Sequence, residues 1–133
     1  MHLEAQWVVG FVDSQECFQC SCEHRSKENG LSPVTPQFVV CRNRRDIRLL
    51  YALKGFFGRG VVRIRQQHDQ GIYLIKEVHD LIQTVIPFFD KHLLKTSQRV
   101  VFQKFRRIVL KMDRGERLID EDLFFFVDQH KSR

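Results

Sequence analysis

Four cysteines, Cys17, Cys20, Cys22 and Cys41, are the first residues whose types and spacing suggest chemistry. Cys17 and Cys20 form a C-x-x-C pair that could hold a metal ion, but no second pair follows at the spacing usual for zinc. In the stretch CFQCSCEH, alternation puts Cys20 and Cys22 on one side of a strand, where small buried thiols are sufficient. We therefore expect reduced cysteines rather than a zinc site or a disulfide framework.

A second feature is the stretch WVVGFVDSQECF at residues 7–18, which is apolar as far as Val12 except for Gly10. It then turns abruptly polar at Asp13, Ser14, Gln15 and Glu16. The pattern predicts a helix over about residues 3–14. From residue 17 the apolar period changes to two, which predicts a strand.

The charge of the chain favours a polyanionic partner. Its 133 residues include 22 Lys and Arg against 16 Asp and Glu, a formal net charge of +6. A chain of this length has room for one domain over residues 1–133 with one core. The excess of cations points to nucleic acid or an anionic membrane surface. No apolar stretch approaches the roughly 20 residues that a membrane span needs, so we expect no membrane partner.

The remaining pattern predicts the elements that must position these residues. We expect strands at 17–24 and 37–42 around a loop at 25–36, a helix at 47–57 stopped by Gly58, and a hairpin at 60–76. Helices are predicted at 79–89, broken late by Pro87, at 98–112 and at 120–129, before a disordered tail at 130–133. The order αββαββα predicts an α+β fold, a four-stranded antiparallel sheet with helices on one face.

One face of this sheet is predicted to be polar and basic. If Phe18, Cys20, Cys22, Phe38 and Val40 pack against the helices, then Val62 and Ile64 face inward too, and Arg63 and Arg65 face outward with Gln19, Ser21, Glu23, Gln37, Val39 and Cys41. Arginine can pair with guanine and glutamine with adenine in a major groove, while cations neutralise phosphates. A merely solvated face is the plain alternative. The nearby cluster Arg42, Arg44, Arg45 and Arg48 favours DNA.

The stretch WVVGFVDSQECF resembles the LAGLIDADG motif of homing endonucleases. That motif is an apolar helix with a glycine, then Asp, a small residue, an acidic residue and glycine before a strand that starts with Phe. FVVCRNRRDIRLLYALKGFFGRGVVRIR, the hairpin to Lys76, LIQTVIPFFDKHLL and VVFQKFRRIVLKM look like successive blocks of the same family, so the resemblance covers roughly residues 5–130. The motif alone is a weak pattern, whereas the ordered set of blocks is much more specific.

A single motif implies the homodimeric branch of this family. Two motif helices would pack side by side, with Gly10 letting their backbones approach, and the implied dimer interface is Val8, Val9, Gly10, Val12 and Asp13. Without the resemblance, Gly10 is an ordinary small residue in a core helix. A two-fold dimer would bind a long, pseudo-palindromic double-stranded DNA target.

The resemblance also implies a double-strand break that depends on Mg²⁺ or Mn²⁺. The position of the metal-binding acid is occupied by Gln15, and Glu16 replaces the glycine after it. Two alternatives stay open: the chain is an altered version of an active protein, or Glu16 takes the role of the acid, although a shift of one residue turns a helical side chain by about 100°. We favour impaired metal binding, because an amide supplies no negative charge.

Other family positions carry over one by one. The polar residue near the scissile phosphate corresponds to Arg42, and the lysine that orders solvent around the metal corresponds to Lys95, with Arg99 as the alternative. Asp13 would be a structural, hydrogen-bonded residue at the helix end. Each of the cations could equally be a plain surface charge. The candidate catalytic residues are therefore Gln15, Arg42 and Lys95.

The expected partners follow from the same comparison. The residues expected to contact DNA are Gln19, Ser21, Glu23, Arg25, Gln37, Val39, Arg42, Arg44, Arg45, Arg63, Arg65 and Lys76. The alternative function is binding of DNA or intron RNA without cleavage, as in maturase-like relatives. The resemblance implies an intracellular protein, of an organelle (chloroplast or mitochondrion) or of the microbial cytoplasm.

Overall fold

Helices and strands alternate along the chain in the predicted order. The computed structural model describes residues 1–22 and 34–131. Its strands are β1 (Phe18–Cys22), β2 (Val34–Asn43), β3 (Val61–Arg65) and β4 (Gln70–Ile75). The longer helices are α1 (Ala5–Asp13), α2 (Ile47–Phe57), α4 (Ile86–Lys91), α5 (Gln98–Asp113) and α6 (Asp120–Lys131), and the short ones are η1 (Arg44–Asp46), η2 (Gln66–His68), α3 (Val78–Asp80) and η3 (Leu81–Val85).

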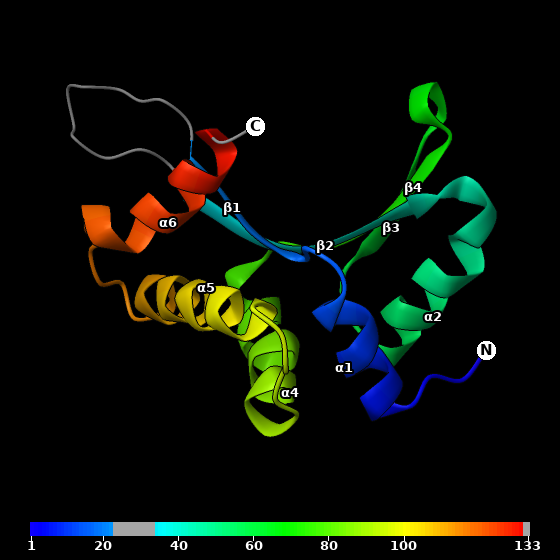
Figure 1. Cartoon of the computed structure of the whole chain (residues 1–133), viewed down its shortest axis with the longest axis horizontal. Helices are drawn as coiled ribbons and strands as arrows, with labels where there is room; N and C mark the ends of the chain where they lie inside the picture. Colours follow the sequence, from blue (N-terminus) through cyan, green and yellow to red (C-terminus); the bar gives the residue numbers. More distant parts are fainter. Residues whose placement is uncertain (23–33, 132–133) are drawn as a thin grey trace.

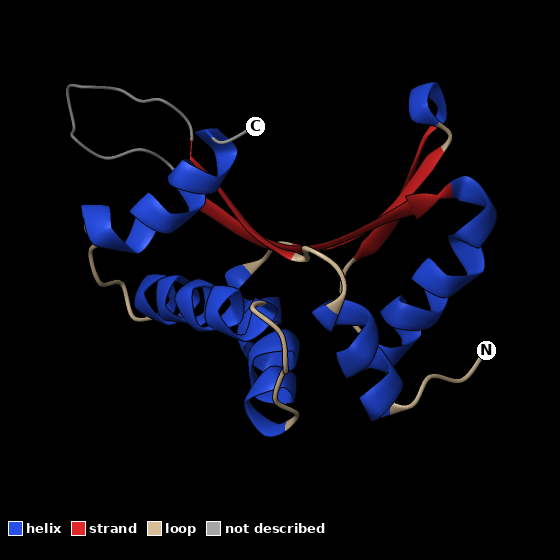
Figure 2. Cartoon of the chain, viewed as in Figure 1, coloured by secondary structure: helices blue, strands red, loops and turns tan. Residues whose placement is uncertain are grey.

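The strands form one antiparallel sheet in the order β1-β2-β4-β3. The sheet bends into a saddle, and α1, α2, α4 and α5 lie on its convex side (Figure 1). No described helix covers the middle of the concave side (Figure 2). The predicted α+β class, with helices on one face of a four-stranded sheet, is therefore confirmed.

Aromatic side chains fix the sheet to its helices. The ring of Phe18 in β1 lies 5.3–5.7 Å from the rings of Phe38, Phe89, Phe102 and Phe105. Such tilted and edge-on pairs contribute roughly 0.5–1.5 kcal/mol each beyond the area they bury. The start of β1, which follows the polar end of α1, is thereby held in place against α4 and α5.

Strand β2 begins earlier than predicted, since Val34–Pro36 belongs to the strand and not to the loop. The backbone N of Val39 donates to Cys17 O in β1, so the N of Pro36, three residues away, points toward β4. Pairing with β4 stops at Phe38 opposite Ile75. Because nothing in β4 needs a donor at this point, the proline costs the ladder no hydrogen bond.

Pro87 does not break its helix, contrary to the prediction. The helix runs from α3 through the π-helical turn η3 into α4, which continues to Lys91. Ile86 N donates to Leu81 O, five residues back, in place of the usual carbonyl four residues back. A π turn just before a proline changes the pairing at the point where the ring removes a donor, so the helix continues.

One further boundary and one side chain differ from expectation. Helix α6 extends to Lys131, so the predicted tail at 130–133 includes two helical residues, and 132–133 lie outside the described residues. Ile64 is on the helix side of β3, as predicted, but remains 45% exposed. The reason is that β3 is the edge strand, while Leu50 and Ile47 of α2 pack onto its neighbour β4 at Gly71, where an added Cβ would lie 2.8 Å from Leu50 Cδ1.

Within residues 1–22 and 34–131, no helix has both the length and the apolar character needed to cross a bilayer.

Candidate nucleic-acid interface

The carboxylate of Asp13 ties the end of α1 to the segment before α5. It accepts hydrogen bonds from the backbone N of Lys95 at 2.8 Å and of Thr96 at 3.0 Å, and Thr96 Oγ1 lies 2.8 Å from it. Burial by itself would raise the pKa of Asp13, but these backbone and hydroxyl donors and the Lys95 charge outweigh it and hold the pKa below its ordinary value. Asp13 is thus the structural, hydrogen-bonded residue that the sequence predicted.

This anchor brings Lys95 to the end of α1 from 82 residues along the chain. The Lys95 side chain is exposed, and its Nζ donates to Leu93 O at 3.2 Å. Gln15 is half-buried, with Nε2 3.4 Å from Ser14 Oγ, and Glu16 is exposed beside it. The structure therefore brings the predicted Gln15, Glu16 and Lys95 to one end of α1, and their chemical roles stay predictions.

The donors at this end do not by themselves fit a divalent metal ion. Both carboxylate oxygens of Asp13 already accept hydrogen bonds, and the amide of Gln15 is neutral. Within the described part of the chain, no three or more His, Cys, Asp or Glu side chains gather closely enough to share an ion. One copy of the chain offers Glu16 as the remaining carboxylate here.

The cysteines pack as small side chains. Cys17, Cys20 and Cys41 form no disulfide, and Cys17 and Cys20 are buried. Burial raises the pKa of the Cys17 thiol to about 12, so it is protonated at neutral pH. The side chain of Cys22 lies outside the described residues.

Arg42 lies on the helix side of the sheet rather than on the open side. It is paired with Gly71, and the neighbouring row of Val40 and Tyr73 two residues away forms part of the core. Its Nη2 is 3.0 Å from the Asp46 carboxylate, and its guanidinium lies 5.8 Å from the ring centre of Phe11. Strand alternation thus turns Arg42 toward α1, and its predicted contact with DNA near the scissile phosphate stays a prediction.

The open face consists of cross-strand rows, since residues opposite each other in a ladder share a face. The apolar row is Val39, Leu74 and Val61, the mixed row is Cys41, Ile72 and Arg63, and the polar row is Asn43, Gln70 and Arg65. On the other side of the apolar row lie the pairs Gln19–Gln37 and Ser21–Thr35.

Most residues predicted to contact DNA lie on this face or at its margin. Gln19, Ser21, Arg63, Arg65 and Lys76 are exposed, Gln37 is half-buried, and Arg44 and Arg45 are exposed in η1. Glu23 and Arg25 lie outside the described residues. Val39 is on the predicted face but is only 9% exposed, because Leu74 and the backbone-bonded Cys17 flank it. Direct contact through Val39 is therefore not supported.

Register also identifies residues that the sequence reasoning missed. Asn43, Gln70 and Thr35 lie on the open face, and none was predicted to contact DNA. The signal that could have found Asn43 is the alternation of β2 continued by two residues beyond Cys41. Gln70 requires the hairpin register, which sets it beside Arg65 across η2.

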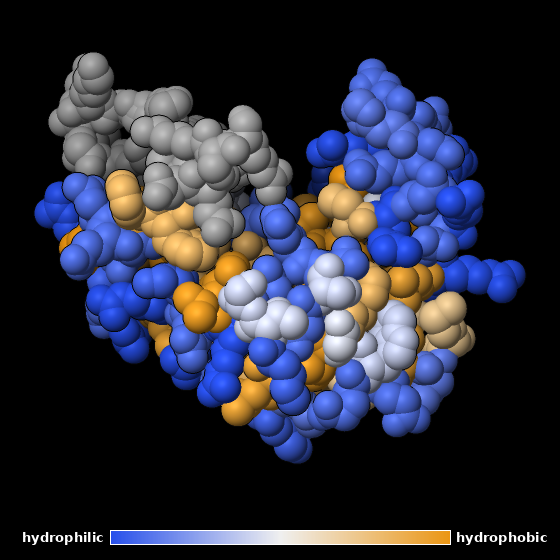
Figure 3. All heavy atoms as spheres, viewed as in Figure 1, coloured by the Kyte–Doolittle hydropathy of each residue, from blue (hydrophilic) through white to orange (hydrophobic). Residues whose placement is uncertain are grey.

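Positive charge gathers at the end of the saddle formed by the β3–β4 hairpin. Arg44 N donates to Asp69 O at 2.9 Å, so η1 lies against the hairpin tip, next to the polar row. With the described residues, Arg44, Arg45, Arg63 and Arg65 form no ion pairs. The space-filling view shows this wall of the hollow as strongly hydrophilic, with apolar atoms at its foot (Figure 3).

The dimer-interface residues divide into two groups. Val8, Val9 and Val12 are 0–2% exposed within their own chain, and their contact with a partner stays a prediction. They occupy the face of α1 that packs into the core. Gly10 is exposed, and a Cβ placed there meets no atom within 4 Å. Trp7, stacked on Phe11 at 5.1 Å and 45% exposed, lies one turn before Gly10.

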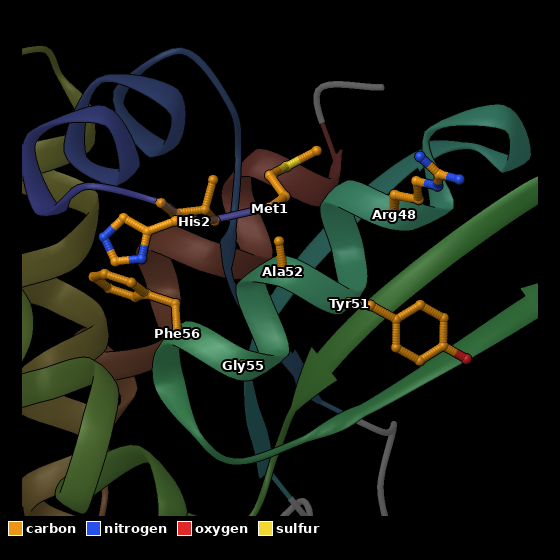
Figure 4. Close-up of a pocket in the computed structure, with 8 residues that line it drawn as sticks. Met1, His2, Arg48, Tyr51, Ala52, Gly55 and Phe56 are labelled. Carbon is orange, nitrogen blue, oxygen red and sulfur yellow. The ribbon is translucent and has the colours of Figure 1, made fainter.

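A separate pocket of about 740 Å³ lies between the N-terminal segment and α2. His2 and Phe56 lie on one side of it, and Arg48 and Tyr51 lie toward the other (Figure 4). Arg48 of the arginine cluster lines this pocket, and none of the candidate catalytic residues does.

A four-stranded saddle with an open, cationic face, and the helix α1 that ends beside it, identify the chain as an α+β protein of the nucleic-acid-binding class. The chain belongs to the LAGLIDADG endonuclease family, whose sequence profile matches residues 8–109. It is 41% identical to the homing endonuclease I-TnaI, with a TM-score of 0.80 over 96% of this chain and 86% of that one. Fold alone is shared with I-SmaMI bound to its uncleaved DNA target in the presence of calcium ions, at 20% identity and a TM-score of 0.80, over 94% of this chain and 42% of that one.

A curated relative is the probable intron-encoded endonuclease 2 of Neurospora crassa, which is 25% identical over 117 residues. The match covers 88% of this chain but 24% of the fungal protein. The chain therefore spans about a quarter of the length of that relative.

Proposed function

We propose that the chain is a sequence-specific DNA-binding protein that acts as a homodimer, each copy binding half of a long pseudo-palindromic target in its saddle. The observation that carries this proposal is the open face, where Arg63, Arg65 and Gln70 project from rigid, paired strands. These side-chain types pair with guanine and adenine edges in the major groove, and arginines at the rim, which form no ion pair with the described residues, can neutralise phosphates.

The homodimer is supported by the open side of α1. Gly10 leaves space for a second backbone, and Trp7 offers an exposed apolar ring beside it. The chain matches 86% of the homing endonuclease I-TnaI, so the two chains are of similar length.

The ancestral reaction is a metal-dependent double-strand break with Mg²⁺ or Mn²⁺, and we propose that Gln15 weakens metal binding. The relatives named as endonucleases support the reaction. The neutral amide supports the impairment, because Mg²⁺ prefers charged oxygen ligands. Each copy of the chain contributes one Glu16 carboxylate, so a homodimer would bring two of them toward its axis.

A second candidate is the same fold used to bind DNA or intron RNA without cleaving it. One observation favours it, namely that Gln15 removes the acidic side chain at the motif position. The intron-encoded relatives support an intracellular site of action, in an organelle or in microbial cytoplasm, for either candidate.

The test uses the purified chain and a library of randomised DNA duplexes. Bound duplexes are selected in EDTA and sequenced, and cleavage is then followed with Mg²⁺ or Mn²⁺ for the unchanged chain and for Gln15→Glu. We expect enrichment of a two-fold-related sequence, affinity that falls steeply with salt, and cleavage by Gln15→Glu that exceeds that of the unchanged chain by at least tenfold.

Each result bears on one part of the proposal. Cleavage by the unchanged chain as fast as by Gln15→Glu would contradict the weakened metal site. Binding without cleavage by either protein would favour the second candidate, and the same assay with a structured RNA pool would identify an RNA partner. Absence of any enriched duplex, with binding insensitive to salt, would contradict DNA recognition.

A further inference from the structure

An apolar row crosses the open face of the sheet. Its Leu74 is half-buried and its Val61 is 42% exposed, and both lie on the side of the sheet that faces away from the helices. On one side of this row lie the polar side chains of Gln19 and Gln37, and on the other side lie first the mixed row that contains Ile72 and Arg63 and then the polar row that contains Gln70 and Arg65. A face that was merely solvated would have no need of a central apolar band.

The position of this row relates it to the end of α1. Val39 N donates to Cys17 O at 2.8 Å, and Cys17 follows the Gln15–Glu16 pair directly. The core packing of Phe18 and the cross-strand pairing of Val61 with Leu74 hold the band rigidly. The side chains of the apolar row are therefore fixed in the floor of the saddle. The row lies beside Cys17, which joins the polar end of α1 to β1.

We propose that the apolar row, through Val61 and Leu74, reads thymine by contact with its 5-methyl group. This inference rests on the proposed DNA-binding function. In the major groove the thymine methyl is the one apolar group on a base edge, and aliphatic side chains are its natural partners. The row accordingly prefers thymine at a block of positions in each half-site, while the arginine rows prefer guanine beyond it.

Strand geometry gives the spacing between the two kinds of preference. Successive rows on one face are two residues apart, about 6.8 Å along an antiparallel strand. Since DNA rises about 3.4 Å per base pair along each strand, one row corresponds to about two base pairs where strand and groove run together. The thymine block and the position read by Arg65 are thus about four base pairs apart, two rows along the face.

The test replaces thymine by deoxyuridine, which lacks only the methyl group, at each position of a duplex selected from the randomised library. Affinities are measured in EDTA by titration. Loss of one buried methyl weakens binding about fourfold, so we expect a drop of this size at a contiguous block of one to three positions in each half-site.

The protein side of the same cycle is Val61→Ser, with Ile64→Ser as the matched control. Val61 and Ile64 belong to the same strand and are 42% and 45% exposed, but they lie on opposite faces. Val61→Ser should bind thymine and deoxyuridine duplexes equally at that block, whereas Ile64→Ser should keep the preference. Circular dichroism and thermal melting of both variants establish that they are folded.

The outcomes separate this inference from the proposed function. If duplexes are selected but deoxyuridine weakens binding nowhere, or if the effect persists in Val61→Ser, the thymine assignment is wrong while DNA recognition stands. If no duplex is selected at all, the proposed function fails and the assignment fails with it.

Discussion

At the scale of single residues, Asp13 and Gln15 show how one short stretch carries two tasks. The carboxylate of Asp13 accepts hydrogen bonds from the backbone of Lys95 and Thr96, and these bonds hold the segment before α5 against α1. Gln15, two residues on, lies free of that anchor and keeps its amide beside Ser14. Gln15 takes no part in the hydrogen bonds of Asp13, so we expect a substitution at position 15 to test chemistry and to leave the anchor in place.

We predict that Asp13→Asn lowers the free energy of unfolding by roughly 1–3 kcal/mol, because the amide keeps one oxygen acceptor and its nitrogen cannot accept the second of the bonds from Lys95 N and Thr96 N. Urea denaturation measures the change. Thr96→Val should cost less, since it removes the hydroxyl and leaves both backbone donors paired. Asp113→Asn, at an exposed position at the end of α5, is the control and should change stability little. Equal losses for Asp13→Asn and Asp113→Asn would contradict the anchor.

At the scale of elements, Asp122 fixes α6 to α5. Its buried carboxylate lies 2.8 Å from Arg107 Nε and 2.9 Å from Lys111 Nζ, and it accepts a hydrogen bond from Ile119 N at the start of α6. Burial raises the pKa of Asp122, but the Ile119 amide and the two cations outweigh it and lower the pKa to about 2. The helix is thus capped by its third residue rather than by its first, Asp120.

We predict that this carboxylate makes stability depend on pH in the acid range. The folded pKa lies below the ordinary value of 3.8, so the contribution is complete above about pH 4 and is lost as the pH falls toward 2. The shift corresponds to about 2 kcal/mol of unfolding free energy. Denaturation of the unchanged chain and of Asp122→Asn should therefore differ at pH 6 and converge near pH 2.

The control for this prediction is Asp120→Asn. Asp120 is exposed and lies two residues before Asp122 in the first turn of α6. It should leave the stability difference between pH 6 and pH 2 almost unchanged. If Asp120→Asn and Asp122→Asn behave alike, α6 is not held by the buried carboxylate.

The same scale shows what the sequence could and could not predict. Local signals gave the correct end of α2, where Gly58 has a φ of 79°, and the hairpin between β3 and β4. They failed at Pro36 and Pro87, because a proline is tolerated where its missing donor faces an unpaired edge or a π turn, and only the register shows that. For the site, alternation places Arg63 and Arg65 on the open face and Arg42 on the helix side, whereas the contacts of Arg42 with Asp46 and Phe11 are visible only in the structure.

At the scale of the whole molecule, the proposed function assigns the open face of the sheet to DNA and the open side of α1 to a second copy. The valines of α1 are buried in the core. The exposed side of the helix, which we propose meets a second copy, carries Gly10 and Trp7. Sequence periodicity alone treated the apolar residues of this helix as one set. Their division into a buried face and an open face arises because α5 and the sheet cover one side of α1, a relation between segments that are far apart in the chain.

We predict that Gly10→Leu prevents dimer formation without destabilising the monomer. A side chain at position 10 meets no atom of its own chain within 4 Å, and leucine favours a helix over glycine by roughly 0.5–1 kcal/mol. In a dimer with close helix backbones the same side chain would hold the two copies apart. Sedimentation equilibrium should show a monomer, thermal melting a fold at least as stable, and affinity for a full palindromic duplex should fall by at least tenfold.

The matched control is Gly55→Leu, because Gly55 also lies within a helix, is exposed and has no atom within 4 Å of an added Cβ. Gly55 belongs to α2 and lines the pocket between this helix and the N-terminal segment, away from the open side of α1. Gly55→Leu should leave both the dimer and DNA affinity intact. If Gly55→Leu instead gives the monomer and Gly10→Leu does not, the subunits meet through α2 and the N-terminal segment, and the two saddles would follow DNA in a different relative orientation.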